Sequence, residues 1–374
     1  MRILIDYRPA LRERTGVGEY MHNLVRAYAR RHAGDGTDVA VFTSSWKDRP
    51  AEGLASELAA RVVDRRVPVR LLNYLWHRME WPPIETLGIA ADVVHAAHPL
   101  LIPTRHAAQV VTFHDLFFLG APEATRAEVR RDYPALAHEH AQRADAVVVN
   151  SRYTASLVER TFGVLPTRVH VCPPGPPAWR ALGRGPHVPR DGYVLFVGTL
   201  EARKNVGALL DAYARLLERR PAAAPLVLAG KSTPDAGAWL ARLTRPPLAG
   251  RVRHLGYVVD REELYAGAHL LVLPSRDEGF GIPVLEAMSA GIPVVAANRG
   301  ALPEVLGDAG LLVDPDDAEG LAAALERMLT DEAFADQCAA RGLARAREFS
   351  WDRAATTLHV AYQAAIANRR ARRA

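Results

Sequence analysis

The chain has 374 residues, of which 49% are apolar and 24% charged, with a formal net charge of +5 and a pI of about 9.3. This length exceeds what one hydrophobic core usually fills, so we expect two domains of ordinary globular composition. The two cysteines, Cys172 and Cys338, are too few for a disulfide framework or a zinc site. No apolar run is long enough to cross a bilayer and the N-terminus does not resemble a signal peptide, so we expect a cytoplasmic protein. The positive charge suits anionic partners, but few aromatic residues interleave with it, which disfavours nucleic acid.

Short apolar runs alternate with amphipathic stretches through the first half of the chain, which is typical of an α/β domain with a parallel sheet. Helices are expected from about 19 to 31, from 123 to 143 with a break at Pro134, and from Ser151 as N-cap to about 162. Strands are expected at residues 1–6, 39–43, 61–69, 92–96, 109–114, 146–150 and 169–172.

A glycine pair, Gly16 and Gly18, lies between the first expected strand and its helix. Such a pair is a weak signal for a phosphate-binding loop, and a simple tight turn is the alternative. The third glycine of a dinucleotide fingerprint is replaced by Met21. A dinucleotide-dependent dehydrogenase is therefore disfavoured, although the pair suggests one.

His114 follows the strand expected at 109–114, and catalytic groups tend to project from the carboxyl ends of parallel strands. A lone histidine is more often structural, but this position favours a functional role. His95 and His98 are competing candidates that rank lower. The aromatic segment 70–83 either packs in the core or lines an acceptor groove, and core packing is favoured.

Two arginine clusters could contact an anionic membrane surface, although either could also be an ordinary solvated face. One lies in the expected helix at 123–143, and the other falls in the last six residues of the chain. Their members are Arg126, Arg130, Arg131, Arg369, Arg370, Arg372 and Arg373. We therefore expect reversible, peripheral attachment to the inner face of the cell membrane.

A proline- and glycine-rich stretch at 173–189 is the best candidate for an interdomain linker. We predict an N-terminal domain at 1–180, a C-terminal domain at 181–350 and a final helix at 351–374. In the second half, strands are expected at residues 193–198, 225–230, 252–255, 270–274, 292–296 and 310–314.

Two adjacent cations, Arg203 and Lys204, follow the strand at 193–198 and precede a helix. Arginine can bind two phosphate oxygens at once and lysine adds a point charge, so this pair suits a diphosphate. A solvated helix start is the weaker reading, because cations are disfavoured near the positive end of a helix.

The stretch 270–298 carries the sharpest signal. Glu278 and the loop Gly279–Ile282 follow a strand, and Pro283 then begins a helix that has no side-chain cap. Exposed N–H groups, glycines and the helix dipole together suit an anion such as phosphate. Glu286 lies in the first turn, where it could bind a ligand or only complement the dipole.

The spacing Glu278-x7-Glu286, with Gly-Phe-Gly-x-Pro between and Ala-x3-Gly-x-Pro-Val-Val after, resembles the signature of family 4 retaining glycosyltransferases. The resemblance is close from Tyr193 to about Leu329 and looser before it. It implies the GT-B fold, which is two doubly wound Rossmann-like domains facing across a cleft. It also implies transfer of a sugar from a nucleotide-diphosphate donor with retention at the anomeric carbon.

The resemblance assigns roles to individual residues. Arg203 and Lys204 would hold the diphosphate together with the loop of Gly279, Phe280, Gly281 and Ile282. Glu286 would bind the ribose and Glu278 the donor sugar. His114, which matches the family's N-terminal His motif, would hold the donor sugar from the other domain, and Gly16 and Gly18 would approach it. Val258 would lie beside the base. Many relatives have arginine where this chain has Thr199, which puts one phosphate contact in doubt.

The resemblance favours GDP-mannose as donor and a saccharide or lipid-linked acceptor, as in bacterial mannosyltransferases of surface polysaccharide synthesis. A UDP-sugar-dependent transferase and a nucleotide-sugar epimerase of the same fold are the alternatives, and a non-catalytic glycan-binding protein leaves the cations unexplained. No metal or other cofactor is expected. The pair Asp314 and Asp316 formally matches a metal motif, but it leads into the acidic start of a helix at 317–329.

Overall fold

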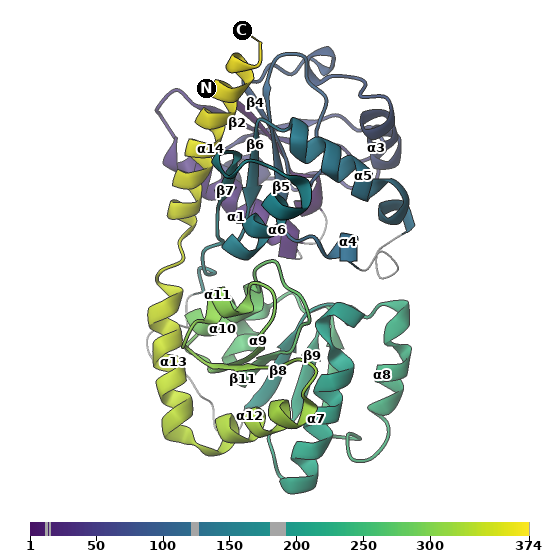
Figure 1. Ribbon diagram of the computed structural model, residues 1–374, viewed down its shortest axis with the longest axis vertical. Helices are drawn as coiled ribbons and strands as arrows, with labels where there is room; N and C mark the ends of the chain where they lie inside the picture. Colours follow the sequence, from purple (N-terminus) through teal and green to yellow (C-terminus); the bar gives the residue numbers. More distant parts are fainter. Residues whose placement is uncertain (12–13, 15, 121–126, 180–191, 374) are drawn as a thin grey trace. The chain divides into compact units, whose positions relative to one another are not determined.

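The computed structural model describes residues 1–374 except 12–13, 15, 121–126, 180–191 and 374, and no side chain is described at 120 or 127–132. The chain forms two compact units. Unit 1 comprises Met1–Pro174 and Ser350–Ala374, and unit 2 comprises Gly175–Phe349. The boundary at 174/175 lies six residues before the one we predicted, within the proline-rich stretch, and residues 350–374 belong to unit 1 (Figure 1).

Unit 1 contains a seven-stranded parallel sheet in the order β3-β2-β1-β4-β5-β6-β7. The order reverses between β1 and β4, which is the topological switch point where open α/β sheets bind ligands. The strands are β1 (Arg2–Asp6), β2 (Asp38–Thr43), β3 (Arg61–Asp64), β4 (Val93–Ala96), β5 (Ala108–Phe113), β6 (Ala146–Val149) and β7 (Val169–Val171).

Both faces of this sheet are buried, so its strands are apolar almost throughout. Successive side chains alternate between faces: Ile3 and Ile5 pack in one core with α1 and α14, and Leu4 packs in the other with α3, α5 and α6. The helices are α1 (Gly16–Arg31), α2 (Leu54–Leu58), α3 (Val69–Arg78), α4 (Phe117–Gly120), α5 (Ala127–Arg143), α6 (Arg152–Phe162) and α14 (Trp351–Ala371).

Three predictions for this half were wrong in detail. Helix α1 begins at Gly16 rather than Glu19, since neither Gly16 nor Gly18 has a positive φ and both continue the helix. The strand expected at 61–69 ends at Asp64, and the aromatic segment after it is the amphipathic helix α3, which buries Leu72 and Trp76. Helix α5 continues through Pro134.

Unit 2 contains a six-stranded parallel sheet in the order β10-β9-β8-β11-β12-β13, again with helices packed on buried apolar strands. The strands are β8 (Tyr193–Val197), β9 (Leu226–Ala229), β10 (Val252–Gly256), β11 (Ala268–Leu273), β12 (Val294–Ala297) and β13 (Leu311–Val313). The helices are α7 (Val206–Arg219), α8 (Gly237–Arg242), α9 (Arg261–Ala266), α10 (Ile282–Ser289), α11 (Leu302–Leu306), α12 (Ala318–Thr330) and α13 (Glu332–Ala346).

The predicted α/β class with two doubly wound sheets is confirmed, since both sheets are parallel and both reverse their strand order once. Most strand boundaries agree with the sequence prediction to within two residues. Among the described residues, none of the helices combines the length and the apolar character needed to span a bilayer.

Candidate active site

The strand order of unit 2 reverses between β8 and β11, so the loops that follow these two strands meet at the switch point. The loop after β8 carries Arg203 and Lys204, in a single 3₁₀ turn (Ala202–Lys204). The loop after β11 carries Glu278. Residues 74 positions apart are thereby brought together at one edge of the sheet.

Lys204 and Glu278 form a buried ion pair in which Nζ lies 2.5 Å from Oε1. The Arg203 guanidinium lies 3.5 Å from the other carboxylate oxygen of Glu278 and 3.1 Å from Glu201. Lys204 is 8% exposed and Glu278 5% exposed. Three of the four residues predicted to be catalytic thus lie in one cluster, with two cations around one central carboxylate.

The pKa of Glu278 is set by opposing effects. Burial alone would raise it, but the charges of Lys204 and Arg203 hold the pKa of this carboxyl below its usual value. Glu278 is therefore ionised at neutral pH, and together with Glu201, which pairs with Arg203, it balances the two cations. Both cations are hydrogen-bond donors of the kind that phosphate oxygens accept from.

Backbone contacts fix the two loops relative to each other. The Arg276 N–H donates to the Arg203 carbonyl at 2.8 Å, and the Ala301 N–H donates to the Glu278 carbonyl at 2.9 Å. Gly300 has φ +61°, and a Cβ there would lie 2.6 Å from the Glu278 backbone nitrogen. This glycine supports the site and was missed, because nothing in its local sequence marks the close approach.

Helix α10 starts directly after the glycine loop, as predicted. Its N-cap is Gly281 at φ +94°, a conformation that glycine adopts without strain, so no side chain caps the helix. Phe280 is buried and meets Phe349 edge-on, at 5.5 Å between ring centroids, which anchors the loop. In this first turn Pro283 has no N–H, and the N–H groups of Val284 and Leu285 donate to the Gly281 carbonyl at 2.9 and 3.4 Å. Anion binding by Gly279 and Ile282 stays a prediction.

Glu286, on α10, is 2% exposed and already has protein partners. The Tyr265 hydroxyl donates to Oε2 at 2.7 Å, and Arg261 pairs with Oε1. Burial and the neighbouring Glu286 charge raise the pKa of Tyr265 well above its usual value, so the phenol stays a donor. Arg261 and Tyr265 were missed by the sequence analysis. Each carboxylate oxygen has further lone pairs, so ribose binding by Glu286 stays a prediction.

The two remaining predicted contacts of unit 2 are half-buried. Thr199 lies just beyond β8, and its carbonyl accepts from the Glu201 N–H at 2.9 Å. Val258 follows β10 and packs against the core of unit 2. Their roles beside a phosphate and a base stay predictions.

His114 lies at the carboxyl end of β5 in unit 1 and is half-buried. Burial lowers the pKa of His114, so the ring is neutral at pH 7. Its Nε2–H then donates to the Ala97 carbonyl at 3.0 Å, which leaves the Nδ1 lone pair as an acceptor. The Tyr20 ring meets it edge-on at 5.3 Å and fixes its orientation. A ligand hydroxyl could donate to Nδ1.

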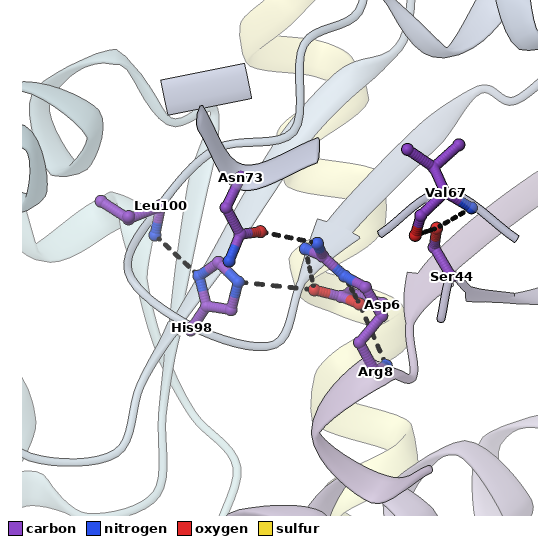
Figure 2. Close-up of polar contacts among 7 residues, drawn as sticks. All are labelled: Asp6, Arg8, Ser44, Val67, Asn73, His98 and Leu100. Carbon is purple, nitrogen blue, oxygen red and sulfur yellow. Dashed lines mark hydrogen bonds and ion pairs between the residues drawn. The ribbon is translucent and has the colours of Figure 1, made fainter. Parts of the chain in front are cut away.

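The two lower-ranked histidines are held by structural contacts. His95 is completely buried between the Tyr362 hydroxyl (2.8 Å) and the Thr112 hydroxyl (2.7 Å). His98 accepts from the Leu100 N–H at 3.3 Å and lies 3.5 Å from Asp6 (Figure 2). Burial lowers the pKa of His95 to about 3 and that of His98 to about 4.

Asp6 ends β1 at the switch point of unit 1, where it contacts Arg8 and His98 (Figure 2). It is fully buried. Arg8 binds both of its carboxylate oxygens at 2.8 and 2.9 Å, and also donates to Asn73 Oδ1 at 2.9 Å. The Arg8 guanidinium packs over the Trp76 ring at 4.9 Å. Burial favours a high pKa for Asp6, but Arg8 overcomes it and the pKa is lowered. This cluster was missed, since three separate segments contribute to it.

Acid is expected to destabilise unit 1. His22, His77, His95 and His98 have pKa values lowered to between about 3 and about 4, with burial as the first cause of each. An unfolded histidine binds a proton near pH 6.5. The unfolded state therefore binds more protons, and stability is lost as pH falls from about 6.5 towards 4.

Melting temperatures at pH 7.5, 6 and 5 measure this loss. His95→Gln keeps hydrogen-bonding groups beside Tyr362 and Thr112 but removes the titrating ring, so the pH slope is expected to become shallower. His106→Gln, at an exposed position, is the matched control and is expected to keep the wild-type slope. An unchanged slope in His95→Gln would contradict the prediction.

Asp314 and Asp316, which formally match a metal motif, each form an ion pair with an arginine. Arg299 lies 3.0 Å from Asp314, and Arg276 lies 2.8 Å from Asp316. Asp317 caps α12 by accepting from the Gly320 N–H at 2.8 Å. The residues therefore form a capped helix start, as the sequence suggested.

Within the described part of the chain, three other side chains lie close enough to share a metal ion: Glu80, Glu139 and His140. Arg143 lies between the two carboxylates and bonds to both. His140 Nδ1 accepts from the Leu101 N–H at 2.9 Å, and burial lowers the pKa of His140, so its other nitrogen carries the proton. Protein groups therefore already occupy one position on each of these three side chains.

Comparison with known proteins places these features in context. A family model described as Glycosyltransferase Family 4 matches residues 14–178, and one described as Glycosyl transferases group 1 matches residues 191–331. The chain is 32% identical to O-antigen chain mannosyltransferase B of Escherichia coli, over 97% of this chain and 100% of that protein. It is 33% identical to D-inositol 3-phosphate glycosyltransferase of Rhodococcus opacus, over 60% and 54% of the two chains.

Solved structures share the fold. Sucrose-phosphate synthase from Thermosynechococcus elongatus superposes with a TM-score of 0.74 at 22% identity, over 97% of this chain and 98% of that one. HepE of Anabaena, solved in complex with UDP and glucose, gives a TM-score of 0.70 at 18% identity, over 96% and 98% of the two chains. These likenesses show the GT-B fold.

Proposed function

Because this chain belongs to family 4 of the glycosyltransferases, we propose that it transfers mannose from GDP-mannose to a saccharide or lipid-linked acceptor in surface polysaccharide or glycolipid synthesis. The full-length similarity to an O-antigen mannosyltransferase carries the choice of sugar. The cluster of Arg203, Lys204 and Glu278 supports the reaction class, because it places two cationic hydrogen-bond donors at a switch point.

In the proposed reaction the bond between the sugar and the diphosphate breaks, and negative charge develops on the departing phosphate. Lys204 and Arg203 stabilise that charge, and the N–H groups at the start of α10 add hydrogen-bond donors. These groups are preorganised by Glu278 and by the backbone contacts of the two loops, so little reorganisation is needed. Glu278 and the Nδ1 atom of His114 accept hydrogen bonds from sugar hydroxyls, and Glu286 accepts from the ribose.

Transfer is proposed to take place at the inner face of the cell membrane, through peripheral and salt-sensitive contact. The exposed arginines at the end of α14 (Arg370, Arg372 and Arg373) support this contact. Of the cluster predicted at 123–143, Arg126 lies outside the described residues, and the side chains of Arg130 and Arg131 are not described.

Donor choice is tested by incubating the enzyme with GDP-mannose, UDP-glucose, UDP-galactose or ADP-glucose and a lipid-linked saccharide fraction, followed by mass spectrometry. Growth of the acceptor by one hexose with GDP-mannose alone is the expected result. A UDP-sugar as the preferred donor would overturn the mannose assignment. An epimerised nucleotide sugar with no acceptor product would overturn transfer itself.

Activity is expected to survive chelation. In the proposed site protein cations bind the diphosphate, so removing divalent ions should change the initial rate by less than about twofold. The measurement compares rates before and after dialysis against EDTA. Activity that is lost to EDTA and restored by magnesium or manganese would contradict the prediction and would implicate Asp314 and Asp316.

A further inference from the structure

A cavity of about 550 Å³ lies in unit 1, between the end of α3, the loop before β5 and the ends of α5 and α14. Its size falls within the usual range of small-molecule sites. Gln109, near the start of β5, lines it, whereas His114 follows the other end of the same strand. Five residues of extended strand separate them by roughly 16 Å, so this cavity lies at the opposite edge of the sheet from His114.

The floor of the cavity is buried and well ordered by hydrogen bonds. Gln109 donates to the Ile102 carbonyl at 2.9 Å, and the His140 Nδ1 atom accepts from the Leu101 N–H. Burial lowers the pKa of His140, so the ring is neutral and its Nε2 atom carries a proton. The floor therefore offers an N–H donor.

The walls are strongly cationic. Four arginines and one glutamate line the cavity: Arg105, Arg143, Arg369, Arg372 and Glu80. Arg143 is balanced by Glu80 and Glu139, and Arg372 donates to the Arg143 carbonyl at 2.7 Å and lies 3.4 Å from Asp145.

Arg369 also lies near Asp145, and its charge favours the ionised form of that carboxyl. The Arg369 Nε atom is buried and has no hydrogen-bond partner within the described residues, which is costly for a polar group.

An aromatic side chain stands at the rim. Trp81 is 56% exposed, although a tryptophan ring is large and apolar. A flat ring next to arginines suits a ligand that joins an anionic group to an apolar or sugar face. A phosphate group offers up to two charges and three acceptor oxygens, which several guanidinium groups can share.

We propose that this cavity binds a phosphate ester, with Arg369 as its principal contact and Trp81 against the group that the phosphate carries. The ester is either a soluble sugar or polyol phosphate or the headgroup of an anionic phospholipid. Because the cavity and the cluster of Arg203 and Lys204 belong to different units, this proposal stands independently of the proposed transfer reaction.

Two binding measurements distinguish a soluble phosphate ester from a phospholipid headgroup. Calorimetry with glycerol 3-phosphate reports a soluble ester, and sedimentation with vesicles of phosphatidylglycerol, compared with phosphatidylcholine, reports a headgroup. In whichever of these two measurements the wild type binds, Arg369→Gln is expected to weaken that binding by about tenfold or more. Arg353→Gln, an exposed arginine at the other end of the same helix, is the matched control and should change that binding by less than about twofold.

Further variants keep the test decisive. Lys204→Ala should leave this binding unchanged, and Trp81→Ala, at the exposed rim, should weaken it even if Arg369→Gln does not fold. Absence of binding both to glycerol 3-phosphate and to phosphatidylglycerol vesicles would overturn the proposal. Equal losses in Arg369→Gln and Arg353→Gln would overturn it in favour of diffuse surface charge. Loss in Lys204→Ala would place the phosphate in unit 2 and overturn it as well.

Discussion

Replacing Lys204 with alanine is expected to lower kcat by roughly a hundredfold to a thousandfold without unfolding the protein. Lys204 is 8% exposed, so its charge acts in a largely desolvated site. It lies at the switch point where the departing diphosphate is proposed to sit. The variant also breaks the buried pair with Glu278 from one side, and Arg203, 3.5 Å away, balances that carboxylate only in part, so a lower melting temperature is expected as well. Arg203→Ala is expected to reduce turnover in the same direction.

Steady-state kinetics with GDP-mannose measure the effect. Arg276→Ala is the matched control: Arg276 lies on the loop after β11, is exposed and pairs with Asp316, so its removal should change kcat by less than about twofold. Near wild-type kinetics in both Lys204→Ala and Arg203→Ala would refute the assignment of these cations to the diphosphate.

Removing the charge of Asp6 is expected to cause the largest loss of stability among single carboxylates of unit 1. Asp6→Asn leaves the Arg8 guanidinium, whose side chain is 7% exposed, without its bidentate counter-ion. Breaking a buried ion pair from one side typically costs about 3–5 kcal/mol. The shift in the urea unfolding midpoint measures it.

Asp38→Asn is the control, because the pair of Asp38 and Arg61 has a similar separation of 3.0 Å but is about half exposed. A loss of at most about 1 kcal/mol is expected there. In the Asp6→Asn background, Arg8→Met should recover part of the lost stability by removing the unpaired charge. Equal midpoint shifts in Asp6→Asn and Asp38→Asn would show that burial does not govern this pair.

Local sequence patterns predicted most of the fold. Apolar runs of four to six residues marked nearly every strand, and Ser151 correctly marked the start of α6 by accepting from the Thr154 N–H. Helix α3 was missed because its apolar residues resemble a continuation of the preceding strand. The glycines at 16 and 18 suggested a turn, although glycine is also compatible with helical geometry and here begins α1.

The candidate site likewise contains residues that local sequence patterns predict and residues that they do not. Arg203, Lys204 and Glu278 were identified from residue types at fixed spacing beside strand ends, and the structure brings them together. Tyr265 and Gly300 could not be identified, because each matters through a contact with a distant segment that no local pattern encodes. The partners of Glu286 are of this kind, as is His98 beside Asp6, so charge balance in a buried site needs the tertiary structure.

Helix α14 has a consequence for the order in which the protein acquires its structure during synthesis. Its buried residues Leu358 and Tyr362 belong to the same core as Ile3 and α1. Domains usually fold in the order in which they emerge from the ribosome. Here all of unit 2 emerges before residues 351–371 are made. The hydrophobic core of unit 1 therefore stays incomplete until α14 has been synthesised. The later unit can therefore complete its core first, and nascent unit 1 is the part that needs protection from aggregation.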